Sequence, residues 1–169
     1  MKRRVSPFGD GVVKLRLLEE RDLHTTLSWR NRDEARVWFK TSAPLTMDQH
    51  AGWFSKYQQR DDDFLFVVES AGMPIGQASV YAIDWEKRSA EVGRFLVAPE
   101  GAGKGFIGRA CAQLVSFSRD VLGLGYIFLE VLESNERAIR LYLQNGFSEE
   151  ERSDGLIRMG QSLSPMDVK

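Results

Sequence analysis

The chain has 169 residues, of which 43% are apolar and 28% charged, and its formal net charge is −1 at pH 7. These values are ordinary for one globular domain with a core of its own, spanning residues 1–169, and they give no reason to expect nucleic acid or a membrane as a partner. A single cysteine, Cys111, excludes an internal disulfide and favours a reducing, cytoplasmic location. The two histidines lack ligand spacing, so no metal site is predicted.

The first third of the chain predicts one strand and three helices. Residues 11–17 are typical of a strand, and an acidic opening predicts a helix over residues 19–29. A short helix is expected over residues 33–39. Thr46 and Gln49 have the spacing of a capping box, which predicts a third helix behind them.

The middle of the chain predicts three strands and the longest helix. Strands are expected at residues 64–69, 75–81 and 90–97, the first two joined by a turn that contains glycine and proline. The aspartates at 61–63 indicate a solvated turn before the first of them. Apolar spacing then predicts a helix over residues 103–122.

The last third predicts a strand at residues 126–131, a helix from about residue 135, and a final hairpin from 147 to 163. The chain has no internal repeat and no linker long enough to separate domains. Helices followed by antiparallel strands and a strand–helix–strand unit predict an α/β fold, with a mixed, mostly antiparallel sheet and helices on both faces.

A short string near the end of the chain carries the strongest functional signal. Helical spacing places Ala138, Ile139 and Tyr142 on one face, with Asn135 aligned, and Gly146 stops the helix. A phenol on the buried side of a helix can donate a proton in a dry site.

A glycine loop precedes the longest helix. In Gly103-Lys104-Gly105, the glycines let backbone N–H groups approach a phosphate, and the helix N-terminus adds partial positive charge. With Gly108 the same residues also spell a dinucleotide fingerprint, for which Glu130 is the candidate ribose-binding acid. The chain that follows Gly108 is too short to complete a doubly wound sheet, which disfavours that alternative.

The string from Asn135 to Phe147 reads Asn-x-x-Ala-x-x-x-Tyr-x-x-x-Gly-Phe and resembles the C-terminal signature of the GNAT acyltransferase superfamily. The order of predicted elements is similar to that family along nearly the whole chain. The resemblance implies the GNAT fold, an acetyl-CoA cosubstrate, no metal, Tyr142 as general acid, and Asn135 beside the acyl-CoA arm.

The resemblance also implies a CoA-binding segment that begins at the end of the strand before the glycine loop. Ala102 stands where the family has Arg or Gln, and Ile107 where it has a small residue, which leaves the register of the first helical turn open. Oxyanion donors would be backbone N–H groups near Leu96 and Val97. The expected cofactor-binding residues are Leu96, Val97, Gly103, Lys104, Gly105, Phe106, Ile107, Gly108 and Asn135.

Acetyl transfer from a thioester needs a neutral amine, donors for the oxyanion and a proton for the thiolate. With unperturbed pKa values of about 10 for a phenol and about 8.5 for a thiol, proton transfer from Tyr142 is uphill by roughly 2 kcal/mol. Glu91, on the strand that leads into the loop, is the predicted base that drains the amine proton through water; a solvated strand carboxylate is the alternative. Glu130 and Glu133 are expected to be exposed.

The N-terminal third decides the acceptor in GNAT enzymes. Here Trp29, Arg30, Asn31, Phe39 and Lys40 are similar to N-acetyltransferases of 4-amino sugar nucleotides and, more widely, to the group that acetylates ribosomal proteins. Cationic side chains would meet a diphosphate and aromatic rings would stack on a base. A nucleotide-linked amino sugar is therefore the expected small-molecule partner. A protein N-terminus, a small amine or antibiotic, and an acyl-CoA-binding module without turnover are the alternatives. GNAT dimers are common, and nothing in the sequence forces one.

Overall fold

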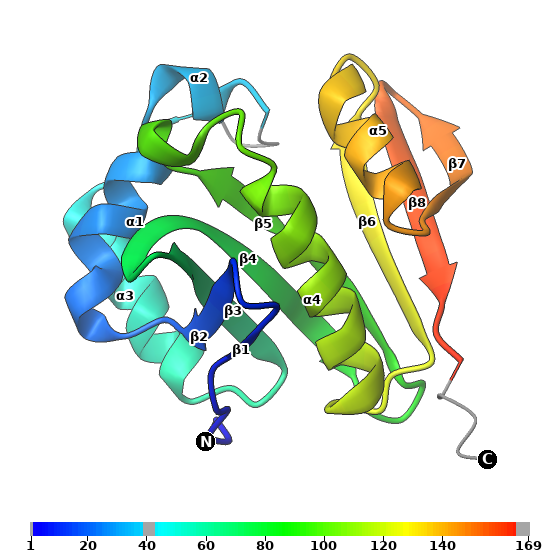
Figure 1. Cartoon of the computed structure of the whole chain (residues 1–169), viewed down its shortest axis with the longest axis horizontal. Helices are drawn as coiled ribbons and strands as arrows, with labels where there is room; N and C mark the ends of the chain where they lie inside the picture. The colour runs from blue at the N-terminus through cyan, green and yellow to red at the C-terminus, as the bar shows by residue number, and fades with distance from the viewer. Residues whose placement is uncertain (1, 39–42, 165–169) are drawn as a thin grey trace.

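The computed structural model describes residues 2–38 and 43–164. Their strands form one eight-stranded sheet in the order β1-β2-β3-β4-β5-β6-β8-β7 (Figure 1). Every neighbouring pair is antiparallel except β5–β6, which confirms the mixed, mostly antiparallel sheet. The strands are β1 (Phe8–Gly9), β2 (Lys14–Leu17), β3 (Asp63–Ser70), β4 (Met73–Asp84), β5 (Ser89–Val97), β6 (Tyr126–Leu132), β7 (Ser148–Ser153) and β8 (Leu156–Ser162).

Helices lie in the connections between β2 and β3, between β5 and β6, and between β6 and β7. Across the described ranges, none is long and apolar enough to cross a membrane. They are α1 (Leu23–Arg30), α2 (Asp33–Arg36), α3 (Met47–Gln58), α4 (Phe106–Asp120) and α5 (Glu136–Gln144), with 3-10 turns at η1 (Glu20–Asp22) and η2 (Pro99–Gly101).

Helix starts follow local chemistry. The Thr46–Gln49 capping box is confirmed, because the Gln49 amide donates to the Thr46 hydroxyl (3.1 Å) and the Gln49 side chain accepts from the Thr46 amide (2.8 Å). The helix predicted from residue 103 begins later, at Phe106. Gly103 and Gly105 have φ values of 77° and 76°, a left-handed backbone that a right-handed helix cannot include.

The two faces of the sheet carry separate cores. Phe64, Phe66 and Val68 of β3 pack in the large core beneath α4 and α5, while Leu65 and Val67 pack against α1 and α3. This alternation follows from the two-residue period of a strand. Helices therefore lie on both faces, as predicted, and α4 and α5 share one of them (Figure 1).

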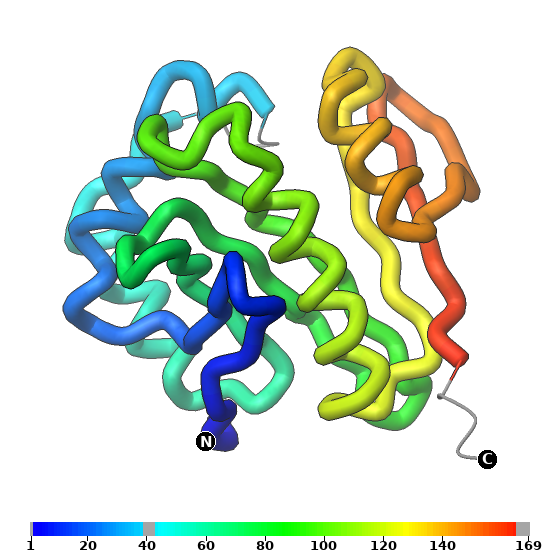
Figure 2. The backbone as a smooth tube through the Cα atoms, viewed as in Figure 1, coloured from blue at the N-terminus to red at the C-terminus, as the bar shows by residue number. Residues whose placement is uncertain are grey.

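The sheet opens between its two parallel strands. β5 and β6 pair only where Ser89–Glu91 face Tyr126–Phe128. Beyond this point β5 continues to Val97 and β6 to Leu132 without pairing to each other, and the strands diverge (Figure 2). Backbone groups on the inner edges of this opening are therefore not used by the sheet and can meet a ligand.

A bulge interrupts β5 beside the opening. The residue pairs Ser79–Gly93 and Gln77–Leu96 enclose one more residue on β5 than on β4. Arg94, inside this interval, has a φ of 54°. A bulge reverses which face the following side chains reach, so the end of β5 differs from the strict alternation expected of the predicted strand.

Candidate active site

Tyr142 on α5 lies in apolar surroundings next to β5. Its ring centroid is 5.7 Å from that of Phe95 and 6.2 Å from that of Phe147. Its hydroxyl makes no hydrogen bond to any residue that the structure describes. The hydroxyl is therefore available to a ligand that enters between α5 and β5.

Burial raises the pKa of Tyr142 above its ordinary value of 10, and the nearby thiol of Cys111 raises it further. The phenol is therefore protonated at neutral pH. A raised phenol pKa makes complete proton transfer to a thiolate costlier than the unperturbed values suggest. The same burial would raise the pKa of a thiol held there, so the difference between the two groups changes less than the phenol value alone.

The end of β5 runs past this phenol with its side chains fixed on both faces. Phe95 packs on the α4 and α5 face, whereas Leu96 packs against Trp29 on the other. The Arg32 guanidinium donates to the Val97 carbonyl at 2.5 Å. The predicted oxyanion donors thus lie on the stretch of β5 that pairs with β4 but not with β6, adjacent to the residue that contacts Tyr142.

The glycine loop ends at the start of α4. A Cβ atom placed on Gly103 or Gly105 would meet nothing within 4 Å, so this side of the loop is open. Phe106, Ile107 and Gly108 form the first helical turn, whose amides have no partner inside the helix, and the turn carries no acidic side chain. This is a suitable cradle for a phosphate group.

The two residues that depart from the GNAT loop pattern, Ala102 and Ile107, each have a defined position in the structure. The Ala102 amide donates to the Pro99 carbonyl (3.3 Å), and its side chain is exposed. The Ile107 side chain reaches toward Gly76 of β4 and is half-buried. Neither side chain blocks the loop, and Lys104 is exposed beside it.

Glu91 lies on the opposite face of the sheet from Tyr142. Its neighbours Ala90 and Val92 are buried in the core beneath α4, so its own side chain points toward the α1 and α3 face. There its carboxylate accepts a hydrogen bond from the Tyr81 hydroxyl (2.7 Å). Glu91 belongs to the last β5–β6 pair and therefore sits where the opening begins.

The prediction of a solvated turn at residues 61–63 is wrong for Asp63, which is 6% exposed. Two Arg94 nitrogens donate to its carboxylate at 2.8 and 3.2 Å, and the guanidinium also contacts the Ser79 hydroxyl (3.2 Å). The guanidinium lies 4.0 Å from the Tyr81 ring centroid. Burial, and then the hydrogen bond to Glu91, raise the pKa of Tyr81.

The predicted acceptor residues have mainly structural contacts. Trp29 is 5% exposed. The Asn31 side chain exchanges hydrogen bonds with the backbone of Leu45 (2.7 and 2.9 Å). Arg30 is half-buried, and burial together with the charge of Arg36 lowers its pKa. Trp29 therefore supports β5 through Leu96, and Asn31 supports the segment before α3 through Leu45.

The other predicted residues are distributed as follows. Phe39 and Lys40 lie outside the described residues. Asn135 caps α5 by accepting a hydrogen bond from a first-turn amide at 3.3 Å. Glu130 and Glu133 are exposed, as expected.

Sequence reasoning missed the polar group around Glu91. Tyr81, Arg94 and Asp63 come from three strands, and Arg32 reaches Val97 across 65 positions in the chain. Only the register of the sheet brings them together, and the sequence offered no local signal for it.

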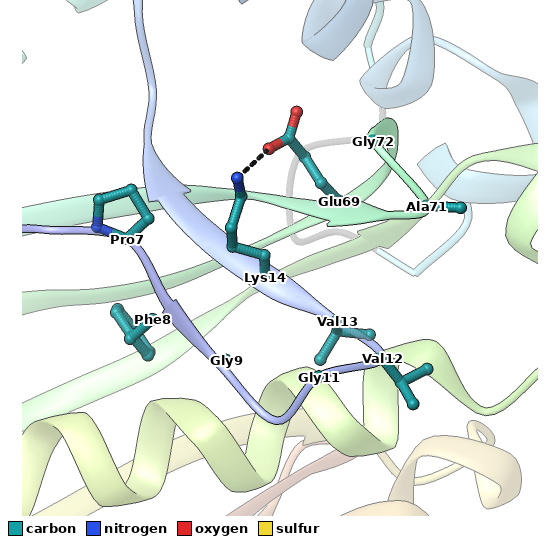
Figure 3. Close-up of a pocket in the computed structure, with 10 residues that line it drawn as sticks. All are labelled: Pro7, Phe8, Gly9, Gly11, Val12, Val13, Lys14, Glu69, Ala71 and Gly72. Atoms are coloured by element: carbon teal, nitrogen blue, oxygen red, sulfur yellow. Dashed lines mark ion pairs between the residues drawn. The ribbon is translucent and has the colours of Figure 1, made fainter.

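The surface hollows of the described chain include two whose lining differs in its relation to the site. The larger, of about 390 Å³, lies between the β1–β2 hairpin and the β3–β4 turn, where Lys14 and Glu69 form an ion pair at 3.8 Å (Figure 3). None of its lining residues belongs to the site. The smaller hollow, of about 190 Å³, adjoins the candidate site, because Tyr81 and Arg94 line this hollow together with Trp53.

The described chain thus combines a splayed parallel strand pair, open amides at a glycine loop and a half-buried phenol. Residues 13–148 match the model of the family described as "Acetyltransferase (GNAT) domain". The chain therefore belongs to the GNAT family, as the resemblance predicted, and is an acetyl-CoA-dependent N-acetyltransferase.

Several similar proteins carry a named acetyltransferase activity. The spermidine N(1)-acetyltransferase of Vibrio cholerae is 33% identical over 140 residues, which cover 82% of this chain and 80% of that protein. The enzyme of the same name from Escherichia coli K12 is 32% identical, with 82% and 74% covered. A putative ribosomal N-acetyltransferase of Bacillus subtilis is 28% identical, with 85% and 82% covered.

The solved structures with a similar fold include those of a spermidine N-acetyltransferase. The crystal structure of the Vibrio cholerae spermidine N-acetyltransferase in complex with CoA and spermine has a TM-score of 0.83 and 28% identity, covering 90% of this chain and 96% of that one. A dodecameric structure of the same enzyme has a TM-score of 0.77 at 28% identity, covering 90% and 95%. In the part of the chain that the structure describes, no three His, Cys, Asp or Glu residues are grouped as metal ligands.

Proposed function

We propose that this protein acetylates a primary amine of a small polyamine of the spermidine class. The observation that carries the proposal is the similarity to two spermidine N(1)-acetyltransferases at 32–33% identity over 82% of the chain. The fold of the relative that binds CoA and spermine supports it over 90% of the chain. The small-amine alternative thus fits better than the nucleotide-linked sugar expected from the N-terminal third.

The local structure also gives little support to the sugar nucleotide. Of the aromatic rings that would stack on a base, Trp29 is buried against Leu96 and is not available. On the face where the acceptor would approach, the carboxylate of Glu91 is held by Tyr81. A fixed carboxylate attracts an ammonium group more readily than a diphosphate.

The positions of Tyr142 and Glu91 on opposite faces support direct transfer in a ternary complex. With the CoA pyrophosphate on the amides of residues 106–108, the thioester arm lies in the opening between β5 and β6. The amine approaches from the face of Glu91, and the sulfur leaves toward the face of Tyr142. Attack and departure on opposite sides avoid a clash between the nucleophile and the leaving group.

Each proton has a carrier in this scheme. A polyamine has a pKa near that of lysine, about 10.4, so it arrives as an ammonium and gives one proton to solvent before attack. Its nitrogen bonds to the carbonyl carbon, the oxyanion is stabilised by amides near Leu96 and Val97, and Glu91 accepts the second proton through water. The carbon–sulfur bond then breaks, the sulfur takes the proton of Tyr142, and solvent restores the phenol.

Thiol release from acetyl-CoA tests the acceptor. Purified protein is given spermidine, spermine, a UDP-linked 4-amino sugar, or a peptide that carries the free N-terminus of a ribosomal protein. The expected result is the highest kcat/KM with spermidine or spermine. A higher kcat/KM with the peptide would instead support the role named for the Bacillus subtilis relative, and one with the sugar nucleotide would restore the original expectation; either result overturns the polyamine proposal.

A further inference from the structure

Arg94 occupies an unusual backbone position for its residue type. Its φ of 54° lies in the left-handed region, which is strained for a non-glycine residue. Strain of this kind persists only where the surroundings hold it in place, and it concentrates at functional sites. Here the position is the bulge of β5, directly before Phe95, which contacts Tyr142.

Three contacts hold Arg94. Its guanidinium forms a two-pronged ion pair with Asp63 (2.8 and 3.2 Å) and contacts the Ser79 hydroxyl. Its backbone carbonyl accepts a hydrogen bond from the Gln77 side chain (3.0 Å). Asp63 has a nearly buried side chain, 8% exposed, so the pair is less screened than a surface ion pair.

The Arg94 guanidinium also contacts Tyr81, the residue that holds the candidate base Glu91. It lies over the Tyr81 ring at 4.0 Å, within the range of a cation–π contact. The Tyr81 hydroxyl donates to Glu91 (2.7 Å). Arg94 therefore belongs to the bulge that shapes the end of β5, and its side chain also contacts the Tyr81 ring that orients Glu91.

We propose that Arg94, anchored by Asp63, is a positioning residue for acetyl transfer. It fixes the bulge that directs Leu96 and Val97 toward the acetyl group, and it fixes the Tyr81 ring whose hydroxyl orients Glu91. This inference rests on the roles proposed for those β5 residues, and it is independent of which amine is the acceptor.

The chain offers a matched control. Arg88, in the β4–β5 turn, has a φ of 56°, and its side chain donates to the Gly123 carbonyl (2.7 Å). Substitution by glycine relieves the backbone strain at either position and removes the side-chain contacts. Arg94→Gly and Arg88→Gly therefore differ only in which contacts are lost, and Arg94→Lys keeps the charge without the two-pronged geometry.

Steady-state kinetics and CoA calorimetry on these variants test the proposal. Misplacement by about 1 Å at a reacting centre costs about 100-fold in rate. We expect Arg94→Gly to lower kcat by that order, with an unchanged Kd for CoA, whose pyrophosphate binds elsewhere. Arg94→Lys should recover part of the loss, and Arg88→Gly should retain kcat. A folded Arg94→Gly protein with the kcat of the wild type would overturn the proposal, even if its melting temperature falls.

A second readout needs no acceptor. A ketone analogue of acetyl-CoA, in which a methylene replaces the sulfur, keeps the carbonyl but cannot transfer the acetyl group. The ratio of the Kd values for CoA and this analogue reports contacts of β5 with the carbonyl. We expect Arg94→Gly to change that ratio and Arg88→Gly to leave it unchanged; an unchanged ratio in both counts against the proposal. If the wild type acetylates another amine and not spermidine, the polyamine proposal fails while the Arg94 comparison is still made.

Discussion

The two faces of the sheet meet at the same opening, but the surroundings of the proposed acid on one face differ from those of the proposed base on the other. On the α4 and α5 face, Tyr142 lies among apolar side chains, and no polar group in the described chain binds its hydroxyl. On the α1 and α3 face, Glu91 is bound by Tyr81, which in turn lies beneath Arg94. Apolar surroundings raise the pKa of the phenol and keep it neutral, whereas a hydrogen bond orients the carboxylate on the other face.

The difference indicates which kind of substitution each face tolerates. The apolar face should be sensitive to loss of one hydroxyl and insensitive to distant charges. The polar face should be sensitive to any change along its chain of contacts. The following predictions test this contrast in order of decreasing expected effect.

The largest effect is expected for Tyr142→Phe. General acids contribute about 100-fold or more to rate, so kcat should fall at least that far while calorimetry shows an unchanged Kd for CoA. Tyr57→Phe is the control on the opposite face of the sheet from Tyr142, because it removes a buried hydroxyl that accepts from the Leu65 amide (3.0 Å). It should lower the free energy of unfolding and spare kcat. If Tyr142→Phe retains full kcat, another group protonates the sulfur.

On the polar face, Glu91→Gln should lower kcat/KM by about 100-fold at neutral pH, at the low end for a general base. The amide has nearly the same shape but cannot accept the amine proton. Glu130→Gln and Glu133→Gln, at exposed positions, should leave kcat/KM unchanged. If either of these variants loses more kcat/KM than Glu91→Gln does, the base is the glutamate replaced in that variant.

Gly105→Ala should weaken CoA binding about tenfold, because a φ of 76° strains an L-residue by roughly 1–2 kcal/mol. Gly72→Ala in the β3–β4 turn has the same φ of 76° and serves as the control for strain alone. Calorimetry should show normal CoA affinity for Gly72→Ala. Equal affinity for both variants would argue against a phosphate site at residues 103–108.

The smallest effect concerns the dependence of stability on pH. Burial raises the pKa of the Cys111 thiol from 9 to about 12. The folded state thus keeps a proton that the unfolded state loses above pH 9, so this contribution to stability is complete below pH 9 and is lost as pH rises toward 12. Urea unfolding between pH 9 and 10 should show a shallower decline for Cys111→Ala than for the wild type. Parallel declines would show that the thiol titrates normally.

The sequence predicted the apolar face far better than the polar face. Tyr142 lies in a contiguous string whose helical spacing, cap and terminating glycine are all local, so its side of the site followed from neighbours in the chain. Glu91 was chosen from its strand, but its contacts required the register of β3, β4 and β5. A one-residue slip in that register would have placed every side chain on the other face.

Errors in the prediction have similar causes. Asp63 was assigned to a solvated turn because three aspartates adjoin, whereas β3 begins with it and Arg94 pairs with it from 31 positions away. The helix predicted to extend to residue 122 ends at Asp120, which leaves Val121 62% exposed. A bulge, which reverses alternation, has no reliable signature in a single sequence.

The narrow seam between β5 and β6 has a mechanical consequence. Within the described chain, the strand ladder between the half of the sheet that contains β6, β8 and β7 and the half that contains β1–β5 has only three residue pairs. A molecule that spans from the glycine loop to α5 acts as a brace between the halves and stabilises the folded state by mass action. The cosubstrate thereby becomes part of the architecture, and amide hydrogen exchange in β6 should slow when CoA fills the opening.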